Sequence, residues 1–302
     1  MQNLKTPIKS SDLSLINSQL SNYEEPSVLQ IEITTKCNLI CTFCKNGTEA
    51  VQSRGSMNLE EYKLILNQGK LFWRRINLWG TGEPFLHPDF FRMARIAKEM
   101  NIERIKVSTN GHLFTDKNIK LVLANGITDI RIAIESVDPE AYRKQRVKGD
   151  LSKVVIGLKK MVAARNEHNK KIKISICSVV STLDPSERER VADFTKNIGA
   201  DEYEAMANIW GDQFQIEKLP MPTSRCNQQL NTFNVLANGD VIPCCHTYLG
   251  EIILGNIYNN SVLEVWQGEL ALAERRKFLE NKFRFCPACN YGIDLNKYSE
   301  KL

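Results

Sequence analysis

Three cysteines stand close together near the start of the chain, separated by three and then by two residues. They are Cys37, Cys41 and Cys44, and a strand-like stretch, residues 29–33, precedes them. Iron–sulfur clusters are normally held by four cysteines, so three thiolates would hold a four-iron cubane with one iron open to another ligand. A zinc site or scattered core cysteines are the alternatives. A structural zinc needs four ligands, and the next cysteine is the distant Cys177.

This pattern resembles the signature of the radical S-adenosylmethionine (SAM) enzymes. In that family the open iron chelates the amino and carboxylate groups of SAM. Reductive cleavage then gives a 5′-deoxyadenosyl radical, which takes a hydrogen atom from an unactivated C–H bond. The resemblance implies a flavodoxin- or ferredoxin-type reductant. It also assigns Phe43, just before Cys44, to the aromatic position that flanks adenine.

A second motif, Thr81-Gly82-Glu83-Pro84, follows a predicted strand that ends in Trp79. It resembles the family's Gly-Gly-Glu-Pro motif, with Thr81 in place of the first Gly, where the Glu and neighbouring backbone bind the SAM amino group. A Gly-Glu-Pro turn alone is weak evidence, because ordinary strand-to-helix turns contain it. Its position one strand–helix unit after the cysteine loop strengthens the assignment.

Further SAM contacts are expected where later strands end, because barrel active sites lie at the carboxyl ends of the strands. By resemblance, Asn110 faces the active site, and Glu135 or Ser136 touches the ribose or methionine part of SAM. Arg146 matches the family's Arg in its segment, and its fork can pair with the SAM carboxylate. Arg143 lies three residues away on nearly the same helix face, so it is the alternative.

Composition places few other limits on the chain. It has 302 residues, 25% charged and 42% hydrophobic, with a formal net charge of +5 and both signs interspersed. We see no dense Lys/Arg tract, no apolar run of membrane-spanning length and no signal-peptide core, so neither nucleic acid nor membrane is an expected partner. Nine cysteines without an export signal predict metal ligation in a reducing cytoplasm.

Short apolar runs alternate with amphipathic helices between about residues 28 and 206. We predict strands at residues 29–33, 75–79, 104–108, 129–135, 171–180 and 202–206, and helices at residues 58–72, 88–100, 116–124, 152–167 and 185–198. Six such units predict a partial (β/α)6 TIM barrel, the core fold of the family, with an open doubly wound sheet as the alternative. The expected division is an N-terminal segment 1–27, a core domain 28–219 and an auxiliary domain 220–302.

The C-terminal region carries a second cysteine set. Asn238-Gly239 between apolar runs predicts a tight β-hairpin that brings Cys244 near Cys286 and Cys289. With Cys226 these thiols could hold an auxiliary [4Fe–4S] cluster, giving two clusters in all. A four-cysteine zinc site is the alternative, and Cys245 could replace Cys244 as ligand.

The set resembles the SPASM/twitch extension of radical SAM enzymes. The full SPASM form has two further cysteines, whereas residues 290–302 contain none, so the resemblance implies the truncated, single-cluster twitch form. Twitch enzymes include a dehydrogenase of the scyllo-inosamine type, in which the auxiliary cluster accepts an electron, and the region also resembles sugar epimerases, in which a thiol returns hydrogen.

The favoured function is therefore hydrogen abstraction from a carbinol carbon of a sugar or cyclitol, ending in dehydrogenation or epimerisation. Cys177 and Cys245 are candidate hydrogen donors, and Glu204 could face adenine or substrate. Modification of a ribosomal precursor peptide is the alternative, although the stretch before residue 28 is short for a leader-binding domain. A metal-stabilised scaffold would not explain the three-cysteine site. The candidate pocket residues are Glu32, Trp79, Asn110, Glu204 and Trp210.

Overall fold

The computed structural model describes residues 23–46, 49–179, 185–206, 226 and 228–286 of the chain. Within them, nine strands form one sheet in the order β11-β10-β9-β1-β3-β4-β5-β7-β8. All neighbours from β1 to β8 pair in parallel. These six strands are β1 (Val28–Ile31), β3 (Arg75–Leu78), β4 (Arg104–Thr109), β5 (Asp129–Ala133), β7 (Lys173–Val179) and β8 (Glu202–Met206).

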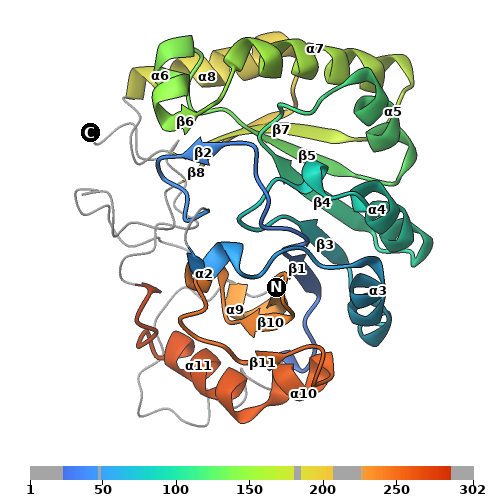
Figure 1. Cartoon of the computed structure of the whole chain (residues 1–302), viewed down its shortest axis with the longest axis vertical. Coiled ribbons are helices and arrows are strands. Elements are labelled where there is room, and N and C mark those ends of the chain that lie inside the picture. Colours follow the sequence, from blue (N-terminus) through green and yellow to red (C-terminus); the bar gives the residue numbers. More distant parts are fainter. Residues whose placement is uncertain (1–22, 47–48, 180–184, 207–225, 227, 287–302) are drawn as a thin grey trace.

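A helix follows each of the first five parallel strands, as the sequence predicts. Figure 1 shows these helices along the outer side of the curved sheet. The fold is the predicted partial (β/α)6 barrel, because a doubly wound sheet would carry helices on both faces. These five helices are α3 (Leu59–Gln68), α4 (Phe90–Glu99), α5 (Asp116–Ala124), α7 (Leu151–Glu167) and α8 (Pro185–Ile198). A further helix that was not predicted, α6 (Pro139–Gln145), lies between β5 and α7. None of the described helices is long and apolar enough to cross a membrane.

Local signals explain where the helices begin and end. Asn58 caps α3 through a capping box with Glu61, as its side-chain type predicts. The caps of α5 and α7 are Thr115 and Asp150, just before the predicted helix starts at residues 116 and 152. Gly126 and Gly199, which follow α5 and α8, have left-handed backbone conformations, as helix C-termini favour.

Two short elements shape the cysteine loop. Strand β2 (Ile40–Cys41) pairs antiparallel with β6 (Arg146–Val147), and the short helix α2 (Glu49–Gln52) follows β2 in the sequence. The register places Cys41 opposite Arg146. The β2–β6 pair was not predicted, because two-residue strands have no recognisable periodicity. The 3-10 turn η2 (Pro84–Leu86) follows β3.

The C-terminal region extends the barrel sheet. The predicted hairpin is present, because β9 (Thr232–Val235) and β10 (Asp240–Ile242) pair antiparallel around Gly239, whose φ is +84°. Strand β9 also pairs in parallel with β1, which the sequence did not predict. The rest comprises α9 (Gln228–Asn231), the turn η5 (Cys245–Thr247), β11 (Gly255–Asn256), α10 (Val262–Gln267) and α11 (Glu269–Leu279).

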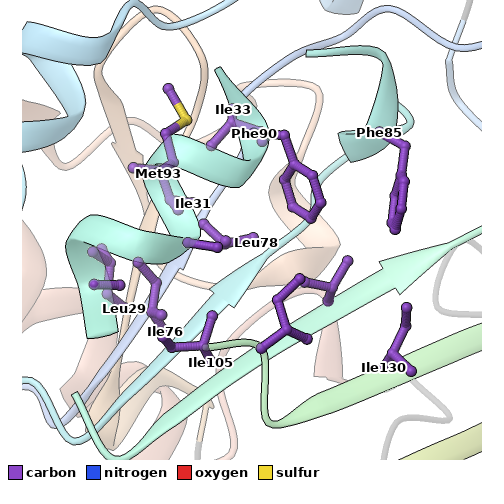
Figure 2. Close-up of a cluster of buried hydrophobic side chains, with 14 of the residues drawn as sticks. Leu29, Ile31, Ile33, Ile76, Leu78, Phe85, Phe90, Met93, Ile105 and Ile130 are labelled. Carbon is purple, nitrogen blue, oxygen red and sulfur yellow. The ribbon is translucent and has the colours of Figure 1, made fainter. Parts of the chain in front are cut away.

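The largest hydrophobic core fills the space between the sheet and its outer helices. Figure 2 shows strand residues such as Ile31, Leu78 and Ile105 beside Phe90 and Met93 of α4. Each of these side chains is almost fully buried. Full burial of such a side chain stabilises the fold by roughly 1.5–3 kcal/mol. This core keeps the strand ends in fixed positions, and the strand ends carry the site.

Candidate functional site

All three cysteines of the N-terminal motif line one cavity of about 250 Å³. They follow β1 directly, so the loop that carries them lies at the carboxyl end of the barrel strands. The backbone N–H of Asn46 lies 3.4 Å from the Cys44 Sγ and donates to it. Three thiols that line one cavity could hold a four-iron cubane and leave one iron open to another ligand. Among the described residues, no group of three or more His, Cys, Asp or Glu side chains is arranged to hold a single ion.

The electrostatics of Cys41 depend on Arg146. Burial raises the pKa of the Cys41 thiol to about 12, and the guanidinium of Arg146 acts in the opposite direction. One guanidinium nitrogen lies 3.7 Å from the Cys41 Sγ. A nearby cation favours the thiolate, which is the form that ligates metal.

The Arg146 side chain is itself fixed. Its fork donates to both carboxylate oxygens of Glu135, and both side chains are buried. Its guanidinium carbon also lies 5.5 Å from the ring centre of Phe43, which lines the cavity. The alternative for this role, Arg143, is exposed. Arg146 therefore connects the cysteine loop to the end of β5.

The Thr81-Gly82-Glu83 part of the second motif borders the same cavity. The buried Glu83 carboxylate accepts hydrogen bonds from the Thr109 hydroxyl at 2.7 Å, the Asn110 backbone N–H at 2.8 Å and the Phe85 N–H at 3.2 Å. Burial nevertheless raises the pKa of Glu83. These donors hold the carboxylate in one orientation at the cavity wall.

Close packing explains why glycine occupies the centre of this motif. A Cβ on Gly82 would lie 2.2 Å from the Thr34 carbonyl oxygen, so any other residue would push the motif away from the cysteine loop. The Glu83 N–H donates to the Lys36 carbonyl, beside Cys37. Pro84 begins η2 and is buried, but it is not among the residues that line the cavity.

Of the other residues predicted to bind the cofactor, some line the cavity and some do not. Asn110 lines the cavity and donates to the Asn38 side chain at 2.9 Å, which ties the end of β4 to the cysteine loop. Ser136 is buried and donates to Glu187 at 2.6 Å. Neither Glu135 nor Ser136 is among the cavity-lining residues.

Glu32, a candidate pocket residue, is completely buried and belongs to a network behind the wall. Its carboxylate accepts two hydrogen bonds from Arg54 and two from the hydroxyl and N–H of Thr81. Arg54 also donates to the Tyr248 carbonyl at 2.6 Å. Sequence reasoning missed Arg54 and Tyr248, because nothing in their local sequence marks a contact about two hundred residues away.

The rest of the described wall combines polar, aromatic and thiol groups with the apolar Leu39, Ala133 and Val179. Trp79 and Asn110 were predicted, whereas Gln30, Ser108 and Arg131 were missed. The overlooked signal was a polar residue inside an otherwise apolar strand. Glu204 lies near β5 but is not among the lining residues, and Trp210 lies outside the described residues.

Both candidate hydrogen donors reach the cavity. Cys177 on β7 and Cys245 in η5 are buried thiols on its wall, although they are separated by 68 positions in the sequence (245 − 177). Burial raises the pKa of the Cys177 thiol to about 11, so it stays protonated at neutral pH. A protonated thiol carries the hydrogen atom that a donor must supply.

The adjacent Cys244 faces a different environment. It packs in a cluster with Leu230, Phe278, Leu279 and Phe283, and Cys286 packs against the same cluster. Cys245 instead packs with Leu236, Ile242 and Tyr248. Of the four predicted auxiliary ligands, Cys244 and Cys286 are therefore brought into one neighbourhood. The Sγ of Cys226 accepts a hydrogen bond from the Gln228 N–H at 3.3 Å, and Cys289 lies outside the described residues.

Comparisons with known proteins match two family models to the chain. The family model of the Radical SAM superfamily matches residues 31–195, which is more than half of the chain. The model of SPASM, an iron-sulfur cluster-binding domain, matches residues 226–290.

Curated relatives differ in how much of their length is matched. A probable GTP 3′,8-cyclase of Methanocaldococcus jannaschii is 32% identical over 135 residues, which is 44% of this chain and 45% of that protein. The chain thus spans less than half the length of the first cyclases that it matches. A tungsten-containing aldehyde ferredoxin oxidoreductase cofactor-modifying protein of Pyrococcus furiosus is 27% identical, covering 80% of this chain and 81% of that protein.

Solved structures share the fold. SuiB of Streptococcus suis, bound to precursor peptide SuiA, matches with a TM-score of 0.71 at 14% identity, over 96% of this chain and 77% of that one. BtrN in complex with AdoMet and 2-DOIA matches with a TM-score of 0.59 at 19% identity, over 88% and 93%. At such identities the likeness concerns the fold alone.

Proposed function

Because this chain belongs to the radical SAM superfamily, we propose that it removes a hydrogen atom from a carbinol carbon of a sugar or cyclitol, leaving a ketone or an inverted centre. It is a radical SAM enzyme with a SPASM domain, so a [4Fe–4S] cluster and SAM are among its cofactors. When bound, these groups supply the hydrogen-abstracting chemistry of the family. Substrate and outcome belong to the proposal.

We assign Cys37, Cys41 and Cys44 as the ligands of the SAM-binding cluster. Their shared position on one cavity wall supports this assignment. Arg146, oriented by Glu135, favours the Cys41 thiolate while the loop binds the cluster.

The same cavity suggests how SAM is held. Glu83 would accept a hydrogen bond from the SAM amino group, beside the backbone of Thr81 and Gly82. Phe43 would border adenine, and the Asn110 N–H would orient the Glu83 carboxylate. The Arg146 fork donates to the Glu135 carboxylate. We therefore propose that Glu135 contributes to SAM binding by orienting Arg146. We assign Ser136 and Pro84 to support of the wall, because both are buried behind it.

We propose one auxiliary [4Fe–4S] cluster, held by Cys226, Cys244, Cys286 and Cys289 in a twitch-type domain at residues 220–302, after a core at 28–219. The common packing of Cys244 and Cys286 favours Cys244 over Cys245 as ligand. This leaves Cys245 for the cavity. The reductant would be a flavodoxin- or ferredoxin-type protein.

The observation that carries the carbinol proposal is the pairing of two thiols with hydrogen-bonding groups on one wall. Gln30, Ser108 and Tyr248 can donate to or accept from hydroxyls, and Cys177 and Cys245 line the same cavity. The Gln30 amide donates to the Tyr248 hydroxyl at 2.6 Å, which fixes both side chains. Dehydrogenation needs a base for the hydroxyl proton and an acceptor for one electron, whereas epimerisation needs a hydrogen donor on the opposite face.

Turnover in deuterium oxide separates the two outcomes. Epimerisation should place one deuterium on the inverted carbon, and replacement of the donor thiol, Cys177→Ala or Cys245→Ala, should abolish the inverted product. Dehydrogenation should give a ketone in both variants. If a peptide is modified and polyols do not stimulate SAM cleavage, the second candidate, a precursor-peptide maturase, is favoured instead. The likeness in fold to SuiB is the reason to test that class.

A further inference from the structure

One buried carboxylate joins two parts of the site that lie far apart in the sequence. Glu32 directly follows β1, and its side chain is fully buried. Its Oε2 accepts hydrogen bonds from the Thr81 hydroxyl at 2.7 Å and from the Thr81 N–H at 2.9 Å. Its Oε1 accepts from the N–H of Ala237, in the β9–β10 hairpin, at 3.3 Å. One oxygen therefore contacts the motif that we assign to SAM, and the other contacts the C-terminal region.

Arg54 extends this connection to the cavity. Its Nε lies 2.9 Å from Oε1 of Glu32 and its Nη2 lies 3.2 Å from Oε2, so the fork contacts both oxygens. Such a planar fork restricts a carboxylate to one orientation. The Nη1 of Arg54 donates to the carbonyl of Tyr248, which lines the cavity, at 2.6 Å. The ion pair that holds Thr81 thus also holds a C-terminal part of the cavity wall.

The carboxylate is tightly packed as well as hydrogen-bonded. A Cβ on Gly80 would lie 2.5 Å from Cβ and Cγ of Glu32 and 2.7 Å from its Oε2. The Glu32 N–H donates to the Val235 carbonyl at 2.9 Å, which continues the pairing of β1 with β9. Because protein interiors are close-packed, a displacement of this carboxylate from one side is transmitted to the other side.

From this shared carboxylate we propose that Glu32 is a positioning residue for SAM. It holds the Thr81-Gly82-Glu83 motif in register with the β9–β10 hairpin, so that a change in the hairpin weakens SAM binding. The inference rests on the proposed assignment of that motif to SAM. Glu32 is not among the residues that line the cavity, so it acts through Thr81. SAM affinity therefore depends on the C-terminal region, although the residues assigned to SAM belong to the barrel.

The hairpin turn offers a variant that reaches Glu32 from the side remote from SAM. The Gly239 N–H donates to the Leu236 carbonyl at 2.9 Å, which makes Ala237 the second residue of a four-residue turn, a position that proline favours. Ala237→Pro removes the N–H that Glu32 accepts, and Ala237 does not line the cavity. We expect SAM to bind roughly two- to tenfold more weakly, the range for one lost hydrogen bond. Ala237→Gly keeps the N–H and should bind SAM as the wild type does.

Equilibrium dialysis of SAM against the cluster-loaded full chain measures the affinity, and urea unfolding measures the stability of each variant. Asp129→Asn is the control for a buried carboxylate that pairs with an arginine, Arg104, at the opposite end of the strands. It should leave SAM affinity unchanged. A purely structural role of the hairpin contact would lower the stability of Ala237→Pro without changing its SAM affinity, and that result would overturn the proposal.

A double-mutant cycle shows whether the effect passes through Glu32. In Glu32→Gln the SAM affinity should already be low, and adding Ala237→Pro should lower it little further. Because Glu32→Gln takes the counter-ion from the buried Arg54 and can prevent folding, a second background combines Glu32→Met with Arg54→Met and removes both charges. Losses of SAM affinity that simply add, in either background, would overturn the proposal.

The test is independent of the substrate, because SAM is the only ligand present. Weaker SAM binding by Glu83→Gln together with unchanged binding by Ala237→Pro would remove the role of Glu32 and leave the motif assigned to SAM. Unchanged binding by both variants would remove the assignment and the role of Glu32 together. Neither result bears on whether a polyol or a peptide is the substrate.

Discussion

At the scale of single residues, the cysteines of the site could be identified from their spacing in the sequence. The side chains that surround them could not be identified in this way. Cys37, Cys41, Cys44 and the Thr81–Glu83 motif all reach one cavity, because each directly follows a strand of a parallel sheet. Arg54, Arg131 and Tyr248 were missed because their importance depends on the residues they meet through the fold.

Glu83→Gln tests the carboxylate at the wall. The substitution keeps the shape but turns an acceptor that receives three hydrogen bonds into an amide, whose NH2 must face a donor. We expect SAM affinity to fall about tenfold or more, and the free energy of unfolding to fall by about 1–3 kcal/mol. Equilibrium dialysis of SAM against cluster-loaded enzyme measures the first and urea unfolding the second. Asp89→Asn, on a half-buried carboxylate that is not among the cavity-lining residues, is the control. Unchanged SAM binding in Glu83→Gln would count against the assigned role.

Two buried histidines should make stability depend on pH. Burial lowers the pKa of His87 and of His112. The Nε2 of His112 accepts from the Asp150 N–H at 2.8 Å, so the ring is held neutral. Above about pH 6.5 both imidazoles are neutral in the folded and the unfolded state, so their contribution to the free energy of unfolding is fully present. Below that pH the unfolded state takes up protons before the folded state does, so the free energy of unfolding falls.

Urea unfolding between pH 7.5 and 5.5 would measure this effect. His112→Gln should flatten the loss of stability on acidification, because glutamine can still accept from Asp150 but does not titrate. An equally steep loss in His112→Gln and in the wild type would show that other groups dominate.

At the scale of elements, the alternation of strands and helices was predicted, and the bounds shifted by only a few residues. The β1–β9 pair was not predictable from local pattern. Its partners lie about two hundred positions apart, and a parallel pair has no turn between them to mark it. The β2–β6 pair escaped notice for the opposite reason, since each strand has only two residues.

Val147→Pro tests whether β2–β6 holds the cysteine loop. The Thr42 N–H donates to the Gln145 carbonyl, so by antiparallel alternation Ile40 and Val147 form the next hydrogen-bonded pair. Proline removes that donor, worth about 0.5–1.5 kcal/mol, and should speed loss of the cluster to a chelator roughly two- to tenfold. The decay of cluster absorbance reports it. Val147→Thr keeps the N–H and should decay like the wild type; a similar rate for the proline variant would argue against this role of the pair.

At the scale of the whole molecule, the C-terminal region does more than extend the chain. It adds β9 to the barrel sheet, reaches the Glu32–Arg54 network through Tyr248, and supplies Cys245 to the cavity. The sequence predicted a separate auxiliary domain there. The continuous sheet was unexpected, because hydrophobic pattern identifies a strand without naming its neighbour.

Iron counting tests the auxiliary cluster at this scale. Anaerobic reconstitution should give about eight iron atoms per chain if two four-iron clusters form. The triple variant of Cys37, Cys41 and Cys44 to Ala should keep about half of them. Stoichiometric zinc in place of the retained iron would show that the C-terminal cysteines form a zinc site instead.

The central claim is that a carbinol hydrogen of a polyol is the atom abstracted, and isotope transfer tests it most directly. Polyols deuterated at their carbinol carbons would be incubated anaerobically with reconstituted enzyme, SAM and reductant, and the 5′-deoxyadenosine analysed by mass spectrometry. The account predicts 5′-deoxyadenosine one mass unit heavier with at least one of these polyols. Label that never leaves any polyol, together with deuterium transfer from a labelled peptide, would contradict it.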